Sequence, residues 1–236
     1  MKHIKLFKTE AEYETGVTAL PCVSYVESTE EVHFDEKHAV DRIYNAPLMN
    51  MMYGLGLAEN QDYMTYEEAA RVPSLNTADF ATYEVISAWE LKYFTGLVEF
   101  PRFVNGTYSL QELYIPDHIT TLQSSSLTAL KLNKLHLSEA LTEIPAYGIG
   151  ATDTQDSILY IGANIASSPH ASTCANGWGT IICMSPAFKW QKENRPIVVT
   201  TIYVKDEYVD DYKAVAPWNT WGTVKPLSEY TGDTDY

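Results

Sequence analysis

A short pattern of hydrophobic positions returns five times between residues 113 and 204. Each copy is a triplet whose first and third residues are apolar, the alternation expected where neighbouring side chains of a strand point to opposite faces. The five triplets are residues 113–115, 135–137, 159–161, 181–183 and 202–204. Their first residues are separated by 22, 24, 22 and 21 positions. A near-constant interval in this range predicts stacked repeats, each of which contributes one short strand to a parallel sheet.

Stacking these repeats assigns a place to each position of the triplet. The first positions form one buried ladder, which consists of Leu113, Leu135, Leu159, Ile181 and Ile202. The third positions form a second buried ladder beside it, which consists of Ile115, Leu137, Ile161, Cys183 and Val204. Because no single repeat can cover its own apolar face, the stack is expected to fold cooperatively.

The middle positions of the triplets are predicted to form a column on the outer, solvent-facing side of the sheet. This central column consists of Tyr114, His136, Tyr160, Ile182 and Tyr203. Tyrosine offers contact area with little side-chain entropy to lose, which makes the column a candidate binding surface. The alternative is that its side chains stack across the strands and only stiffen the sheet.

The segments that follow the first two triplets are alike. Residues 113–122 (LYIPDHITTL) and 135–144 (LHLSEALTEI) both continue with polar turn residues, an apolar residue, threonine, a polar residue and an apolar residue. At these residues the chain resembles the leucine-rich repeats of the bacterial surface-antigen type, often called BspA-like, whose pattern is close to L-x-I-P-x-x-V-T-x-I. The resemblance implies a parallel-strand solenoid. Residues 166–178 depart from the pattern, which predicts an irregular insertion in the third repeat.

Segments on both sides of the repeats extend the resemblance. Residues 88–97 are similar to the segment S-F-x-E-L-K-Y-F-T-G-L that precedes such repeats, with Gly96 as a helix stop and Leu97 as the start of the solenoid. Residues 202–214 resemble the last repeat of the family. Residues 217–221 (PWNTW) then resemble an aromatic plug that covers the apolar end of the stack.

Residues 57–70 resemble the calcium loop and following helix often found before this type of repeat. A calcium loop needs oxygen ligands at its first and fifth positions, glycine at the sixth and glutamate at the twelfth. If Glu68 is the twelfth position, Leu57 and Gln61 occupy the first and fifth, and the glycine is also missing. We therefore predict that the segment keeps its helix start, with Thr65 as N-cap, and binds no calcium.

The chain is predicted to be an α+β protein with three regions. Residues 1–36 are interpreted as a small α/β module, too small to be stable alone, that anchors the protein to a neighbour. Residues 37–95 are interpreted as a helical region interrupted at Pro47. Residues 96–236 form the solenoid and its cap. Residues 20–26, followed by residues 32–34, also resemble N-terminal segments that recur in proteins of gut Bacteroidales and their tailed phages.

Composition and charge exclude several classes of function. The 31 acidic and 16 basic residues give a net charge of −15, which disfavours nucleic acid and anionic membrane as partners. No apolar run reaches the roughly 18 residues of a membrane span, and the N-terminus lacks the apolar region of a secretory signal. The cysteines, Cys22, Cys174 and Cys183, show no zinc-site or disulfide-framework spacing. Cys183 is predicted to be a core residue, with a Cys174–Cys183 bridge as the alternative.

The sequence nominates no catalytic or metal site. Its six histidines form no H-E-x-x-H pair, and it contains no phosphate-binding glycine loop, G-x-S-x-G elbow or dinucleotide fingerprint. Asp153 and Asp156 are close enough in sequence to be a carboxylate pair, but their setting is interpreted as an exposed turn. We therefore expect no enzyme activity, no cofactor and no metal.

The repeats and the resemblance together lead to a functional expectation. We expect a non-enzymatic structural or interaction protein: a head or tail appendage or decoration protein in the virion of a tailed phage, assembled in the host cytoplasm. Its partners would be protein neighbours in a homo-oligomer or a larger assembly, without nucleic acid and without membrane insertion. The alternative is an adhesin module at a bacterial cell surface, which binds a host glycan or protein.

Overall fold

The structure, a computed structural model, describes residues 42–103, 108–127, 130–145, 149, 156–168, 178–190 and 199–232. The chain divides into two compact units, Met1–Ile43 and Tyr44–Tyr236. In the first unit only the two-residue strand β1 (Arg42–Ile43) is described. The small module predicted for residues 1–36 therefore lies outside the described residues.

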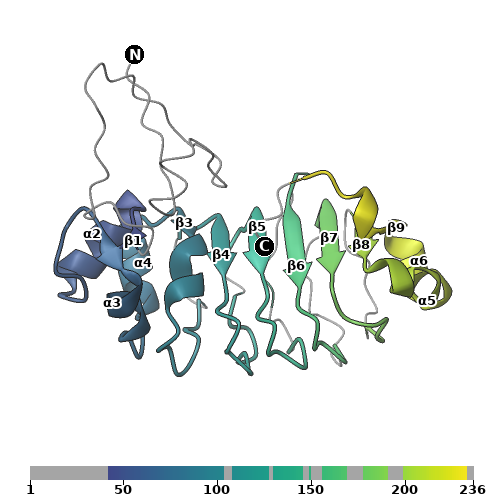
Figure 1. Ribbon diagram of the computed structural model, residues 1–236, viewed down its shortest axis with the longest axis horizontal. Helices are drawn as coiled ribbons and strands as arrows, with labels where there is room; N and C mark the ends of the chain where they lie inside the picture. Colours follow the sequence, from purple (N-terminus) through teal and green to yellow (C-terminus); the bar gives the residue numbers. More distant parts are fainter. Residues whose placement is uncertain are drawn as a thin grey trace, which may run out of the picture. The chain divides into compact units, whose positions relative to one another are not determined.

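The second unit is mixed α/β and is built around an open seven-stranded parallel sheet (Figure 1). The strands are β3 (Ser87–Ala88), β4 (Glu112–Tyr114), β5 (Lys134–His136), β6 (Ile158–Ile161), β7 (Thr180–Cys183), β8 (Thr201–Val204) and β9 (Thr223–Pro226). Their order in the sheet is their order in the chain, and every neighbouring pair is parallel. One strand is therefore added with each repeat of the sequence.

The strands pair in the register that the hydrophobic pattern predicts. Leu113 is aligned with Leu135, Leu135 with Leu159, Leu159 with Ile181, and Ile181 with Ile202. All five side chains are buried, and so are the five third-position residues. The two predicted ladders are confirmed. Burial of one face in every strand fixes this register, because a slip of one residue would turn each apolar side chain to the other face.

Helices precede the sheet in the second unit, as predicted for this part of the chain. They are α2 (Ala46–Gly54), α3 (Tyr66–Ala70) and α4 (Thr77–Thr82), with a short strand, β2 (Met64–Thr65), before α3. The 3-10 helix η2 (Trp89–Tyr93) follows directly after β3. The side chain of Asn45 caps α2 by accepting from the Leu48 amide. Pro47 lies in the first turn of α2, where its missing N–H is harmless, so it begins a helix and does not kink one.

The sheet begins earlier than the predicted start at Leu97. Ser87 pairs with Glu112 and Ala88 with Leu113, so β3 lies inside the region predicted to be helical. Gly96 also has a different role from the predicted helix stop. A Cβ atom at this position would lie 2.0 Å from the Ala70 carbonyl oxygen, so glycine is needed for the close approach of two backbone segments.

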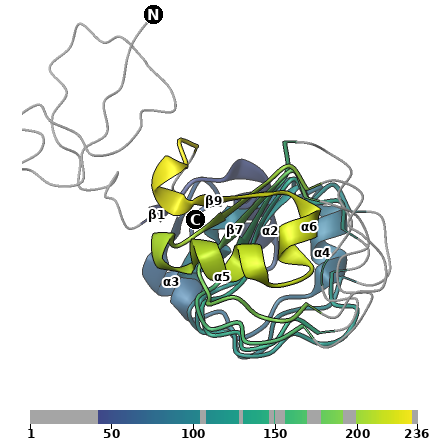
Figure 2. The same cartoon turned by 90° about the vertical axis from the view of Figure 1, so that its right-hand side faces the viewer.

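The end of the sheet at β9 is covered by helices and aromatic rings. The 3-10 helix η3 (Asp206–Tyr208), α5 (Val209–Ala214) and α6 (Trp218–Trp221) follow β8, and the 3-10 helix η4 (Leu227–Glu229) follows β9. Figure 2 shows α5 and α6 lying across this end of the strands. Trp218 is fully buried, and its ring makes edge contacts with Phe188, Trp190 and Tyr212. The predicted aromatic plug is confirmed, whereas β9 was not predicted.

Cys183 is a free thiol in the core, as predicted. Its Sγ lies 2.8 Å from the Tyr212 hydroxyl oxygen and 3.3 Å from that of Ser185. Burial raises the pKa of the Cys183 thiol, so it stays protonated and unreactive at neutral pH. Cys174, the predicted alternative partner, lies outside the described residues. Within the described part of the chain, no helix is long and apolar enough to cross a bilayer.

Candidate functional site

The five residues of the central column lie on adjacent strands. Tyr114 is aligned with His136, His136 with Tyr160, Tyr160 with Ile182, and Ile182 with Tyr203. The column is longer than predicted. At one end Ala88 pairs with Leu113, and the ring of the next residue, Trp89, contacts the ring of Tyr114. At the other end Lys225 is aligned with Tyr203.

The prediction that the central column faces solvent is wrong for four of its five members. Tyr114, His136, Tyr160 and Ile182 are buried, with at most 6% of the surface of any of them exposed, and Tyr203 is half-buried. In Tyr114, His136 and Tyr160 the rings cover one another. The ring of His136 is stacked between those of Tyr114, at 3.8 Å and 6°, and Tyr160, at 4.3 Å and 9°. The spacing of neighbouring strands, about 4.8 Å, brings planar side chains in register into this contact.

Asp117 joins two repeats by accepting three hydrogen bonds. Its carboxylate accepts from the Tyr114 hydroxyl at 2.8 Å, from His136 Nε2 at 2.9 Å and from the Glu139 amide at 3.2 Å. Because an ionised carboxylate can only accept, Nε2 is the nitrogen of His136 that carries a proton. The other ring nitrogen, Nδ1, is buried and has no hydrogen-bond partner among the described residues.

Glu139 repeats this arrangement one strand further along the sheet. Its carboxylate accepts from the Tyr160 hydroxyl and, at 2.6 Å, from the Ala163 amide. Glu139 and Asp117 occupy the same place in their repeats, four residues after the first residue of the triplet. Asp206 also occupies this place and accepts from the Ser228 amide of the following repeat at 3.1 Å. Three acidic residues thus link one repeat to the backbone of the next.

Sequence reasoning did not identify these acidic residues as part of the candidate site. The signal was present, since Asp117, Glu139 and Asp206 stand at the same offset from their triplets. Two of them occupy the polar turn of the resembled repeat pattern, where a solvated role is the ordinary expectation. Their function depends on where the next repeat places its amides, which the sequence of a single repeat does not contain.

The charges of this network are set by burial and hydrogen bonding. Burial raises the pKa of Asp117, but the hydrogen bonds from His136 and Tyr114 outweigh it and leave that pKa below its usual value. Burial and the neighbouring Glu139 carboxylate raise the pKa of the Tyr160 hydroxyl. At neutral pH the carboxylate of Asp117 is therefore ionised and the phenol of Tyr160 is protonated.

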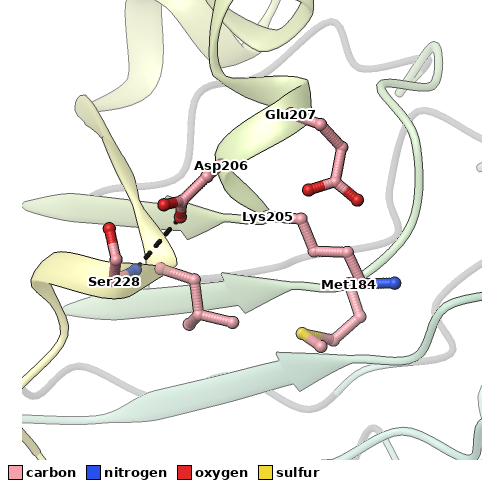
Figure 3. Close-up of a pocket in the computed structure, with 6 residues that line it drawn as sticks. Met184, Lys205, Asp206, Glu207 and Ser228 are labelled. Atoms are coloured by element: carbon pink, nitrogen blue, oxygen red, sulfur yellow. Dashed lines mark hydrogen bonds between the residues drawn. The ribbon is translucent and has the colours of Figure 1, made fainter.

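A shallow pocket lies where the strands at this end of the sheet finish (Figure 3). It is lined by Met184, Lys205, Asp206, Glu207, Leu227 and Ser228. Three of them, Met184, Lys205 and Leu227, each stand four residues after the first residue aligned in β7, β8 and β9, so they neighbour one another across the sheet. The pocket offers an aliphatic floor, one amine and carboxylates.

The loop that resembles a calcium site is held by Glu68. One carboxylate oxygen accepts from the Thr65 amide and hydroxyl at 2.8 and 2.7 Å, and the other accepts from the Glu59 amide at 2.8 Å. Thr65 is the N-cap of α3, as predicted, and forms a capping box with Glu68. No group of three His, Cys, Asp or Glu side chains in the described residues is arranged to hold a metal ion. The absence of calcium binding stays a prediction.

The other carboxylate pair considered in the sequence is only partly described. Asp156 is exposed, and Asp153 lies outside the described residues. Comparison with known protein families, with curated proteins and with solved structures finds no match to this chain.

Proposed function

We propose that the protein is a non-enzymatic structural or interaction protein, a leucine-rich-repeat solenoid of the surface-antigen type that works within a larger protein assembly. The observation that carries this proposal is the bonding between successive repeats. The hydroxyls of Tyr114 and Tyr160 and one imidazole nitrogen of His136 are hydrogen-bonded to carboxylates in the turns that follow β4 and β5. Groups engaged in this way stiffen the stack and do not point toward a substrate.

Contacts outside the strands support the solenoid interpretation. Buried apolar residues recur after successive strands in two series, Leu97, Ile119, Leu141 and Ile165, and then Phe100, Leu122 and Ile144. Away from the sheet, single parallel bridges join Glu143 to Ser167 and Ser168 to Trp190. Successive repeats are therefore bonded on more than one side of the core, as stacking of whole repeats requires.

A tailed-phage virion is the assembly that we favour. The resemblance to surface-exposed repeats and the resemblance of residues 20–26 and 32–34 to phage-associated segments support it. The net charge of −15 suits a protein partner better than nucleic acid or an anionic membrane. In this proposal the protein is an appendage or decoration protein assembled in the host cytoplasm, works as a homo-oligomer, and is anchored through residues 1–36.

The burial of the central column moves the proposed contact surface toward one end of the sheet. Tyr203 is the one member of the column that is not fully buried, and Lys205, two residues further along the chain, lines the pocket together with Met184. Half-exposed tyrosine next to aliphatic surface is typical of protein recognition surfaces. We therefore propose this end, and not the buried stack of Tyr114, His136 and Tyr160, as the region that meets a partner.

The test is incorporation into particles. Deleting residues 1–36 should abolish incorporation while the second unit remains folded by circular dichroism. Changing Tyr203 to serine should weaken the partner contact, whereas the same change at Tyr53, which is 47% exposed on α2, should not. A full-length protein that stays monomeric and is absent from every particle fraction would contradict the proposal. Binding of that monomer to glycan or to a host protein would support the adhesin alternative.

A further inference from the structure

A continuous file of aromatic rings begins at Trp89 and ends at Tyr160. We propose that this file of rings carries out one-electron oxidation. An oxidising radical or metal complex in solution removes one electron from the file, and the unpaired electron that remains localises on Tyr114 or Tyr160. The inference goes beyond the proposed structural role and does not depend on it.

Ring contacts make the path continuous. The ring of Trp89 meets that of Tyr114 edge-on, with the centroids 5.3 Å apart. Tyr114 and Tyr160 then stack on the two faces of His136, at 3.8 and 4.3 Å. Each ring touches the next with no intervening aliphatic side chain. An electron vacancy formed at Trp89 can therefore pass to either tyrosine through rings in direct contact.

Each tyrosine in the file has its own proton acceptor. The Tyr114 hydroxyl donates to Asp117 at 2.8 Å, and the Tyr160 hydroxyl donates to Glu139. On oxidation the phenol gives one electron to the oxidant and its proton to the hydrogen-bonded carboxylate. The products are a neutral phenoxyl radical, a carboxylic acid and an oxidant reduced by one electron. No other bond forms or breaks, and the proton returns when a thiol or other one-electron donor reduces the radical.

Burial protects the radical once it forms. Trp89, Tyr114, His136 and Tyr160 are all at most 8% exposed, with Trp89 the most accessible of the four. A phenoxyl radical held in this file is shielded from coupling with a second molecule. An exposed tyrosine such as Tyr53 has no such protection. The residue that reacts with the oxidant, Trp89, is therefore different from the residues that hold the radical, Tyr114 and Tyr160.

Tyr212 provides an internal contrast. It is also fully buried, but its hydroxyl lies 3.1 Å from the carbonyl oxygen of Ser185 and 2.8 Å from the thiol of Cys183. Neither group is a carboxylate that can take a proton at neutral pH. Burial alone would make Tyr212 equivalent to Tyr160, whereas the proposed proton transfer to a carboxylate distinguishes them.

The experiment is flash oxidation of the full chain by photogenerated ruthenium(III) tris-bipyridine, followed by electron paramagnetic resonance and peptide mapping. We expect a long-lived neutral tyrosyl signal, with oxidation products at Tyr114 and Tyr160. The double variant Asp117→Asn, Glu139→Gln should lose the long-lived signal, whereas the control Tyr212→Phe should keep it. If the double variant does not fold, Tyr114→Phe with Tyr160→Phe preserves the ring stack and should also lose the signal. An undiminished signal in the folded variant, or products confined to exposed tyrosines such as Tyr44 and Tyr53, would overturn the proposal.

Discussion

At the scale of single residues, the acidic side chains after the strands matter more than the composition of the chain suggests. Asp117 serves a phenol, an imidazole and a backbone amide from two different repeats. Hydrogen bonds to a charged group contribute more than neutral ones, and a donor that loses its acceptor inside the protein is costly. The acidic residues behind the −15 net charge are thus not all free surface groups, since some of them hold neighbouring repeats together.

Replacing Asp117 by alanine should therefore lower the free energy of unfolding. We expect a loss of about 1–3 kcal/mol because, although the Asp117 side chain is 49% exposed, two of the donors that lose their acceptor, on Tyr114 and His136, are buried. Urea unfolding followed by fluorescence measures it. The matched control is Asp206→Ala, where the exposed side chain accepts from the Ser228 amide, and a change within about 0.5 kcal/mol is expected. Equal losses of unfolding free energy in the two variants would show that the hydrogen bonds of Asp117 to Tyr114 and His136 do not contribute to stability.

The same carboxylate predicts how stability depends on pH. The pKa of Asp117 is lower in the folded protein than its usual value, so the folded state favours the ionised form. Its contribution is fully present above the usual aspartate pKa of about 3.9 and is lost as the pH falls through the lower folded value. The difference in unfolding free energy between the wild type and Asp117→Asn should narrow over this acidic range. A difference that stays constant there would contradict the assigned role.

How far the sequence predicts single residues depends on what sets their environment. The alternation in Leu113 and its counterparts fixes which side chains face the core, so these residues could be predicted. Alternation also placed Tyr114 and His136 correctly on the other face. It could not reveal their burial, because that depends on planar rings meeting across strands about 4.8 Å apart, which is a property of neighbours and not of one strand.

At the scale of elements, local signals fix the helix starts well and the strand ends poorly. Thr65 and Glu68 predict the start of α3, because a capping box depends only on two residues that are three positions apart in the sequence. By contrast, β3 has only two residues, too few to show a pattern, and β9 ends in Pro226, which argues against a strand. Both strands form because the neighbouring strand offers an unpaired edge, and this tertiary contribution is not visible in the sequence of a short segment.

Glu68 allows the calcium prediction to be tested. Because both of its oxygens already accept hydrogen bonds from Thr65 and Glu59, the loop should bind no calcium. The unfolding midpoint should be the same in excess calcium and in a chelator, and titration calorimetry should show no heat of binding. Glu68→Ala should cost about 0.5–2 kcal/mol through loss of the cap, equally in both buffers. Stabilisation by calcium in the wild type that is lost in this variant would refute the prediction.

Two successive repeats approach each other so closely at Gly162 that no side chain fits there. A Cβ atom there would lie 2.7 Å from the Ser138 carbonyl oxygen and 2.8 Å from the Glu139 Cα, and both are backbone atoms that cannot rotate away. Gly162→Ala should therefore separate β5 from β6 locally and cost about 1–3 kcal/mol. Thermal unfolding measures the loss. The control is Gly54→Ala, where the nearest atoms belong to the movable Tyr83 side chain, and the cost should be smaller.

At the scale of the whole molecule, the order of the strands was predictable because each repeat contains the same apolar triplet. Five triplets at nearly equal intervals determine both the parallel pairing and the register of β4 to β8. The ends follow other rules. Each terminal strand has an unpaired edge and an apolar face to cover, so the chain uses different elements there: helices before β3, and α5 with α6 beside β9.

This asymmetry predicts that the stack opens from its C-terminal end when the plug is removed. Trp218 is fully buried, contacts four aromatic side chains and donates from its indole nitrogen to the Phe188 carbonyl oxygen at 2.8 Å. Trp218→Ala should cost about 3–5 kcal/mol. Because stacked repeats are stabilised mainly by their nearest neighbours, the loss should not be shared equally along the sheet. Amide exchange should accelerate first in β7, β8 and β9 and last in β4, while the half-buried Trp221→Ala control changes it less. If exchange accelerates uniformly in every strand, the repeats unfold as one unit and the plug stabilises all of them together.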